Sequence, residues 1–204
     1  MSLNIVSAKN LAECQIHLLS VISGERFLNN KGLNNEVPFH ICPFKPEISL
    51  DIRQVITQLK NELADKEIDV LDVNLYDLVI SILQDEGDWG WLAKKEATLS
   101  RKELKEELQG ILDTESVLVP AIAQLMRSKS HKVMFITGIG EVFPYIRSHN
   151  VLNNLQRVAK EQPTLMFFPG VYQHTLATGA SLRLFDRLTD DKYYRAFNIL
   201  DRAK

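Results

Sequence analysis

The sequence predicts an α/β fold with three layers, in which a mostly parallel sheet lies between flanking helices. Short apolar stretches typical of strands alternate with longer amphipathic stretches typical of helices, and this rhythm favours a parallel sheet with crossover helices. Two strand-like stretches are apolar at nearly every position, as expected when helices cover both faces of a sheet. The chain has 204 residues, 45% hydrophobic and 25% charged, which is enough for a domain with its own core. We therefore expect one α/β domain over residues 1–204.

The first part of the chain predicts alternating helices and strands. Asn10 and Glu13 are spaced as a capping box in front of a helical apolar pattern. Pro38 precedes a short apolar run, so that run is expected near a strand start or at a sheet edge. Asn74 and Asp77 can cap the helix that follows the second strand. The elements expected here are a helix at 11–22, a strand at 37–43, a helix at 49–63 and a strand at 68–73.

Residues 75–127 predict a helical insertion or subdomain. The segment 85–91 holds both tryptophans and predicts a break between helices. Ser100 and Glu103 form a second capping box, and Pro120 falls in the first turn of the last helix, where proline is tolerated. The helices expected are at 75–83, at 100–110, ended by Gly110, and at 117–126.

The last third of the chain predicts two buried strands. The stretches 133–137 and 164–168 are almost wholly apolar, and the second is expected to stop at Pro169 and Gly170. The remaining stretches are a helix at 151–159 and two short segments, 181–185 and 193–199, whose type the pattern leaves open.

Composition excludes several classes of protein. With 9 Gly, 7 Pro and 2 Cys, the chain is not low-complexity, and it cannot form a disulfide framework or a four-cysteine zinc site. Glu13, Gln15 and His17 interrupt the first apolar stretch, so no secretory signal is predicted. No uncharged apolar run approaches the roughly 18 residues that span a bilayer. We expect a cytoplasmic protein without a membrane partner, in which Cys14 and Cys42 are reduced.

The charge is distributed unevenly along the chain. The net charge is −2, but residues 127–204 hold 12 Lys/Arg and 6 Asp/Glu, a net of +6, which leaves −8 for residues 1–126. Such asymmetry can mark a basic face for a partner or for nucleic acid. It can equally reflect acidic residues that coat exposed helices in the first part, and both interpretations stay open.

The sequence supports neither a phosphate site nor a metal site. Gly138 and Gly140 follow a buried strand, but Phe143 replaces the third glycine of a dinucleotide fingerprint, and no G-x-x-x-x-G-K-[ST] loop is present. Glu141 would repel a phosphate, so we expect these glycines only to permit a tight turn. Asp72, near a strand end, is either a ligand-binding group or a solvated strand end. The five histidines show no metal-ligand spacing, so we predict no metal site. No complete catalytic or phosphate-binding motif is present, including the G-x-S-x-G turn of hydrolases, so we also predict no cofactor and no catalytic residue.

The densest polar segment begins at Glu141 and is a candidate interaction site. Tyrosine and arginine are the usual hot-spot residues of protein interfaces, and they can also stack on and pair with nucleic acid. A structural polar network is the third interpretation. The candidate residues are Tyr145, Arg147, His149, Asn150, Asn153 and Asn154, with Arg195 further along the chain.

Several motifs, taken in order, resemble one protein family over nearly the whole chain. They are FHICPF at 39–44, VNLYDL at 73–78, VMFITGIGEVFPYIRSHNVLNNLQ at 133–156, FFPG at 167–170, SLRLF at 181–185 and YYRAFN at 193–198. Together they look like the BrxB family, a core component of BREX bacteriophage-exclusion systems with no assigned activity. Residues 94–127 match only in helical character.

The resemblance implies a role in phage defence within a multi-protein machine that also contains a methyltransferase, an ATPase and PglZ, an alkaline-phosphatase-like protein. It implies a non-catalytic assembly or adaptor component that binds PglZ and other BREX components and supports host DNA methylation and phage exclusion. Any contact with nucleic acid would then be indirect. Two alternatives remain: a nucleic-acid-binding module that uses the basic C-terminal region, and a degenerate nucleotide-binding protein. Homodimerisation is also left open.

Overall fold

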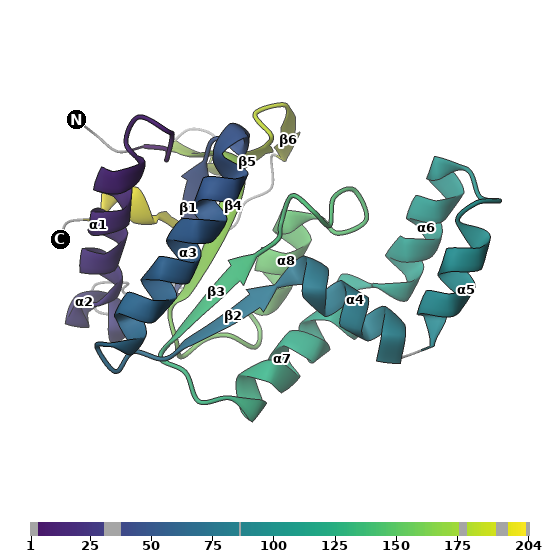
Figure 1. Cartoon of the computed structure of the whole chain (residues 1–204), viewed down its shortest axis with the longest axis horizontal. Helices are drawn as coiled ribbons and strands as arrows, with labels where there is room; N and C mark the ends of the chain where they lie inside the picture. Colours follow the sequence, from purple (N-terminus) through teal and green to yellow (C-terminus); the bar gives the residue numbers. More distant parts are fainter. Residues whose placement is uncertain (1–3, 31–37, 86, 176–178, 191–195, 203–204) are drawn as a thin grey trace.

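The computed structural model describes residues 4–30, 38–85, 87–175, 179–190 and 196–202, and it confirms the predicted α/β fold (Figure 1). A parallel sheet runs in the order β2-β3-β4-β1-β7. Its strands are β1 (Phe39–Phe44), β2 (Val70–Asn74), β3 (Val133–Thr137), β4 (Thr164–Thr175) and β7 (Phe197–Asn198). Every residue of β1 and β3 is buried, which explains why their sequences are so apolar.

Strand β4 is longer than the sequence predicted, because it does not stop at Pro169 and Gly170. It continues to Thr175 and pairs antiparallel with β5 (Gly179–Leu184), which in turn pairs with β6 (Leu188–Asp190). A Cβ atom on Gly170 would lie 2.1 Å from the carbonyl oxygen of Arg183. The glycine therefore permits the close approach of β5 instead of ending the strand. Most of the unassigned segment 181–185 is strand β5.

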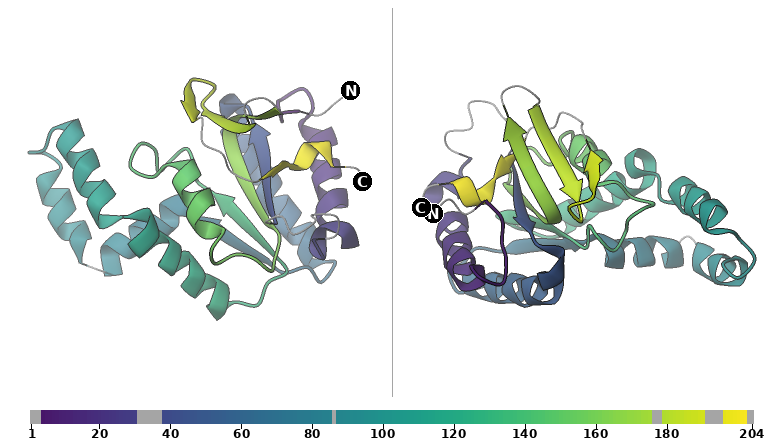
Figure 2. Two further views of the ribbon diagram at one scale, coloured as in Figure 1. Left: turned by 180° about the vertical axis from the view of Figure 1, so that it is seen from behind. Right: turned by 90° about the horizontal axis from the view of Figure 1, so that it is seen from above.

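Helices cover both faces of the parallel sheet (Figures 1 and 2). Helices α1 (Leu11–Ile22) and α3 (Ser49–Ala64) lie on one face, and α7 (Val119–Ser128) and α8 (Ser148–Leu155) lie on the other. The short helix α2 (Glu25–Leu28) follows α1. Neighbouring strand residues alternate between the two cores: Cys42, Phe135 and Phe167 face α1 and α3, whereas Ile41, Ile136 and Met166 face α7 and α8. This is the predicted three-layer arrangement.

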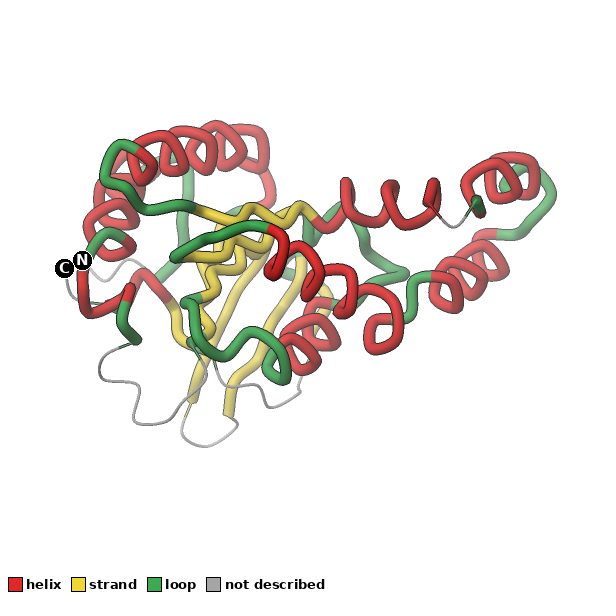
Figure 3. Tube along the Cα trace, turned by 90° about the horizontal axis from the view of Figure 1, so that it is seen from below, coloured by secondary structure: helices red, strands yellow, loops and turns green. Residues whose placement is uncertain are grey.

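The predicted helical insertion is present and extends away from the sheet. It comprises α4 (Leu75–Asp85), α5 (Asp88–Lys95), α6 (Arg101–Ile111), a π-helical turn (Thr114–Leu118) and the start of α7. Helices α5 and α6 contain no fully buried residue and form an arm at one end of the molecule (Figures 1 and 3). The predicted break was wrong for the tryptophans, because Trp89 and Trp91 lie within α5. Gly87, with φ of 81°, separates α4 from α5.

The helix starts show which capping signals were correct. Ser100 and Glu103 form both hydrogen bonds of a capping box, with the Ser100 N–H donating to Glu103 Oε2 at 2.8 Å. Asn74 Oδ1 accepts the N–H of Tyr76 at 2.9 Å, as predicted. The capping box at Asn10 was wrong, because its Oδ1 accepts the N–H of the preceding Ser7 at 2.7 Å. In the described ranges, no helix is long and apolar enough to cross a membrane.

Candidate functional site

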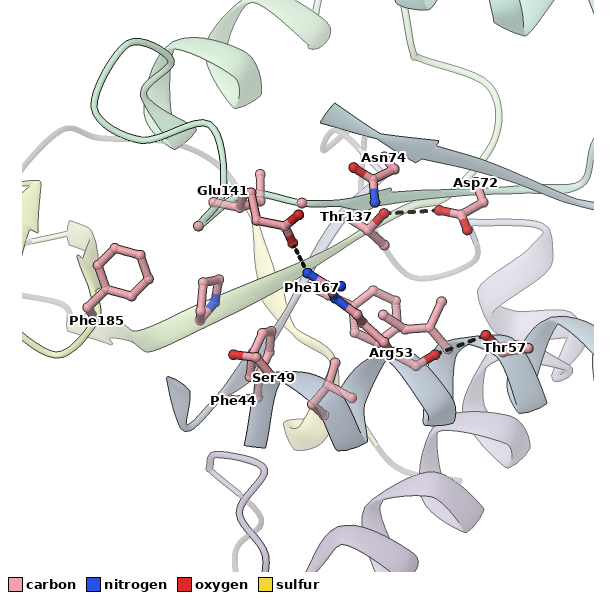
Figure 4. A pocket seen from close by; sticks show the side chains of 16 residues that line it. Phe44, Ser49, Arg53, Thr57, Asp72, Asn74, Thr137, Glu141, Phe167 and Phe185 are labelled. Atoms are coloured by element: carbon pink, nitrogen blue, oxygen red, sulfur yellow. Dashed lines mark hydrogen bonds and ion pairs between the residues drawn. The ribbon is translucent and has the colours of Figure 1, made fainter. Parts of the chain in front are cut away.

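A pocket of about 380 Å³ opens at the carboxyl ends of the parallel strands (Figure 4). The last residues of β1, β2 and β3, which are Phe44, Asn74 and Thr137, all line it. The other lining residues come from α3, β2, β4, the turn after β3 and the residue after β5: Ser49, Ile52, Arg53, Ile56, Thr57, Asp72, Gly138, Ile139, Gly140, Glu141, Phe167, Pro169 and Phe185.

The path of the chain explains why a pocket forms at this edge. Helix α3 follows β1 on one face of the sheet, whereas the chain after β3 leads to α8 on the other face (Figure 1). Connections that diverge in this way leave a crevice, and open α/β sheets bind their ligands in such crevices. The fold therefore brings together two features that the sequence singled out separately, Asp72 and the turn Gly138–Glu141.

A hydrogen-bond network forms the polar wall of the pocket. Asp72 Oδ2 accepts from Lys60 Nζ at 2.6 Å, and Asp72 Oδ1 accepts from Thr137 Oγ1 at 3.1 Å. The Asp72 side chain is only 24% exposed. Asp72 is therefore a compensated, partly buried part of the wall and not a solvated strand end.

An ion pair joins the two sides of the pocket. Arg53 Nη2, on α3, donates to Glu141 Oε1, in the turn after β3, at 2.7 Å (Figure 4). The two side chains are 61% and 38% exposed, so the pair lies where the pocket meets solvent. Nothing in the sequence pattern pointed to Arg53, because its partner is 88 residues away along the chain.

The connection from β1 to α3 does not have the form of a phosphate loop. It consists of Lys45 and a 3-10 turn over Pro46–Ile48, and it contains Glu47 but no glycine. A phosphate loop would place a glycine-rich stretch ending in lysine at this point. Gly138, after β3, has φ of 74°, and a Cβ atom there would lie 2.5 Å from Asn74 Oδ1. The glycine is thus needed for a tight, closely packed turn.

The predicted interaction residues lie in the loop after β3 and along α8. Tyr145 is half-buried, and its hydroxyl donates to the carbonyl oxygen of Glu141 at 3.4 Å. The Arg147 guanidinium lies 5.2 Å from the centre of the Phe143 ring. Of the remaining candidates, His149 is buried, Asn150, Asn153 and Asn154 are partly exposed, and Arg195 lies outside the described residues.

The structure adds residues from other elements to Tyr145 and Arg147. Burial, together with the nearby Tyr76 and Glu141, raises the pKa of Tyr145, so its hydroxyl is protonated at neutral pH. Tyr76, on α4, is 41% exposed, and Leu188, on β6, is 40% exposed. Leu188 lines a shallow hollow with Phe143 and Arg147. We call Tyr76, Phe143, Tyr145, Arg147 and Leu188 the Tyr–Arg surface. Sequence reasoning missed Tyr76 and Leu188 as members, although Tyr76 belongs to the motif VNLYDL.

Neither metal binding nor thiol reactivity is supported by the part of the chain that the structure describes. There, no group of three or more His, Cys, Asp or Glu side chains could hold a metal ion. Cys14 and Cys42 are buried free thiols. Burial raises the pKa of Cys14 to about 11 and also raises that of Cys42. Both thiols are therefore protonated at neutral pH and are poor nucleophiles.

Comparison with known proteins decides the family. A family model described as "BREX protein BrxB" matches residues 71–199. The chain belongs to the BrxB family. A BREX protein BrxB from Bacillus cereus (strain H3081.97) is 32% identical over 190 residues, which cover 91% of this chain and 95% of that relative. A second BREX protein BrxB, from Escherichia coli O9:H4 (strain HS), is 28% identical over 181 residues, which cover 89% of this chain and 87% of the relative. No solved structure matches the chain.

Membership of the BrxB family makes the chain a component of a BREX system, in agreement with a role in phage defence. All five residues of the Tyr–Arg surface fall within the range matched by the BrxB family model. The relatives are aligned over most of both chains, so the whole α/β fold, and not one part of it, carries the likeness.

Proposed function

We propose that the chain is a non-catalytic assembly component of its BREX system and that it binds the alkaline-phosphatase-like protein PglZ through the Tyr–Arg surface. Through this contact it supports the host DNA methylation and phage exclusion carried out by the assembled system. The observation that carries the proposal is the Tyr–Arg surface itself, found on a member of a family of BREX proteins.

The composition and support of this surface favour protein binding. Tyrosine, phenylalanine and arginine are enriched in interfaces, and tyrosine and arginine dominate their hot spots. The loop that presents Tyr145 and Arg147 is anchored from behind by the buried side chains of Ile139, Val142 and Ile146. A surface that is already ordered loses little conformational entropy on binding, which favours affinity.

The pairing of the carboxylates in the pocket supports a role without catalysis. The Asp72 and Glu141 carboxylates are each held by a cation, Lys60 and Arg53 respectively. A general base or nucleophile needs a neighbouring group that orients it toward a substrate, and each of these carboxylates is instead paired with a cation. We therefore infer that the chain contributes binding and not a chemical step.

The experiment is to measure the affinity of this chain for the PglZ-like protein of the same locus, using Tyr145→Ala and Arg147→Ala. We expect each variant to bind at least tenfold more weakly, about 1.4 kcal/mol, as for the loss of a hot-spot residue. Arg26→Ala is the matched control, because Arg26 is exposed on α2, beside α1 on the opposite face of the sheet.

Circular dichroism establishes that each variant is folded before its affinity is compared. Wild-type affinity in both folded variants would show that the contact lies elsewhere. A wild-type chain that fails to bind the PglZ-like protein would remove the adaptor proposal itself. Light scattering on the free chain tests the homodimer that the sequence left open.

A further inference from the structure

We propose that the pocket at the carboxyl edge of the sheet binds an uncharged nucleoside, and that it disfavours the corresponding nucleotide. The proposal does not depend on PglZ binding, because the pocket lining and the Tyr–Arg surface share no residue. It rests on the position, the shape, the lining chemistry and the charge of the pocket.

The position and the size of the pocket are those of a small-molecule site. The pocket lies where the connections after β1 and β3 diverge to opposite faces of the sheet, the usual ligand position in this class of fold. Its volume of about 380 Å³ falls in the range of small-ligand pockets. A nucleoside is a ligand of this scale.

The lining offers an apolar side for a planar base and a polar side for its hydrogen-bonding groups. Phe44 and Phe167 contribute aromatic rings from adjacent strands (Figure 4). Ile52 and Ile56 contribute aliphatic groups from α3. The polar side comprises Asp72 and Asn74 on β2 and Thr137 on β3. An apolar wall that faces fixed polar groups can orient a heterocycle.

The charges around the pocket disfavour phosphate. Among the lining residues, Arg53 is a cation, whereas Asp72 and Glu141 are carboxylates. Arg53 is paired with Glu141, and Lys60 behind the wall is paired with Asp72, so each cation is already balanced by a carboxylate and the lining has no excess positive charge to attract a phosphate. The connection from β1 to α3 adds Glu47 where a phosphate loop would provide glycines and lysine. Nucleosides lack the charge that this lining would repel.

The ion pair between Arg53 and Glu141 lies at the opening of the pocket and can open to admit a ligand. Both side chains are partly exposed, and exposed ion pairs are weak, so the pair can separate at small cost. Separation would free a guanidinium and a carboxylate at the opening of the pocket, and these can then bind the hydroxyl groups of the sugar.

The test uses the full chain with adenosine, guanosine, cytidine and thymidine, each compared with its magnesium triphosphate at the same millimolar concentration. We expect at least one nucleoside to raise the melting temperature by about 2–4 °C at roughly five times its Kd. We expect its triphosphate to bind at least tenfold more weakly in isothermal titration calorimetry.

Thr57→Trp places a large side chain in the pocket wall and should abolish nucleoside binding, since Thr57 is an exposed α3 residue that lines the pocket. Thr57→Gln is the milder variant if the first fails to fold, and it should weaken binding several-fold. Gln54→Trp, at an exposed α3 position outside the pocket lining, is the matched control and should bind normally. The proposal is overturned if no nucleoside binds, if the triphosphate binds as tightly as its nucleoside, or if folded Thr57 variants bind like the wild type.

Discussion

His40 is a histidine that is completely buried inside β1. Its ring lies 4.7 Å from that of Phe27 and 6.0 Å from that of Phe197, and neither ring nitrogen has a hydrogen-bond partner among the described residues. Burial, with a smaller effect from Arg202, lowers the pKa of His40 to about 3. His40 is therefore neutral in the folded chain over the whole physiological pH range.

This burial predicts a loss of stability in acid. Below pH 6.5 the unfolded chain binds a proton at His40, but the folded chain does not until about pH 3, so unfolding is favoured increasingly as the pH falls through that window. Between pH 7 and pH 5 the contribution is about 2 kcal/mol. His40→Leu removes it, so urea denaturation of this variant should show a smaller loss over the same interval. Parallel losses in the variant and the wild type would contradict the prediction.

Two glycines predict opposite responses to the same substitution. Gly138 has a positive φ, and its added Cβ would lie 2.5 Å from Asn74 Oδ1, so Gly138→Ala should destabilise the chain by about 1–3 kcal/mol. At Gly110, within α6, a Cβ would meet nothing within 4 Å. Gly110→Ala is thus the control and should be neutral or stabilising. Thermal unfolding of both variants measures the difference, and equal effects would refute the steric argument.

The structure separates the residues that local spacing predicts from those that only the fold brings together. Ser100 and Glu103 are three positions apart, so their capping box could be recognised from local spacing. The pair of Arg53 and Glu141 exists only because the fold brings α3 to the turn after β3. Tyr145 and Arg147 were chosen as candidate interaction residues from their residue types, whereas Tyr76 lies near Tyr145 only because α4 packs beside the loop.

At the scale of elements, the sequence predicted the helices and strands whose positions follow from the spacing of apolar residues. The helix α3 and the strands β2 and β3 form where the apolar pattern places them. Strand β4 was cut short in the prediction, because a proline and a glycine usually end a strand but here allow β5 to cross closely. Such an effect depends on the partner strand, so the single segment does not reveal it.

Helix α6 depends more on local interactions than on packing, because it has no fully buried residue. Ser100→Ala removes the capping box, which is worth about 1 kcal/mol, and should therefore loosen the first turn of α6. Hydrogen exchange should become faster there, while the unfolding midpoint of the sheet changes little. Ser81→Ala, at an exposed position within α4, is the control. Unchanged exchange in α6 would contradict this account.

At the scale of the whole molecule, the two cores lie on opposite faces of one sheet and are connected through its strands. We expect the sheet and its covering helices to unfold in one cooperative step, as the single-domain prediction requires. The arm of α5 and α6 projects from this body, so it is the part whose local opening can occur without loss of the fold (Figure 2).

The uneven charge of the chain leads to the last prediction. A concavity of about 460 Å³ lies away from the carboxyl-edge pocket, and Arg127, His131 and Lys160 line it together with Glu161. Arg127 and Lys160 form no ion pair with the described residues, in contrast to Arg53 and Lys60. If the basic residues after residue 126, with their net charge of +6, bind nucleic acid, we expect them to bind it at this concavity.

In that case duplex DNA should bind weakly and without sequence preference, with a Kd of about 10⁻⁴–10⁻⁶ M at physiological salt and a steep dependence on salt concentration. Removing two phosphate contacts should lower the slope of log K against log salt by about 1.8, because each contact contributes about 0.9. Arg127→Ala combined with Lys160→Ala should therefore flatten the slope, whereas Lys94→Ala with Lys95→Ala on α5, which removes the same charge, should not. Equal slopes for the two double variants would show that the charge asymmetry reflects solvation of exposed helices. No binding even at low salt would exclude direct contact with DNA.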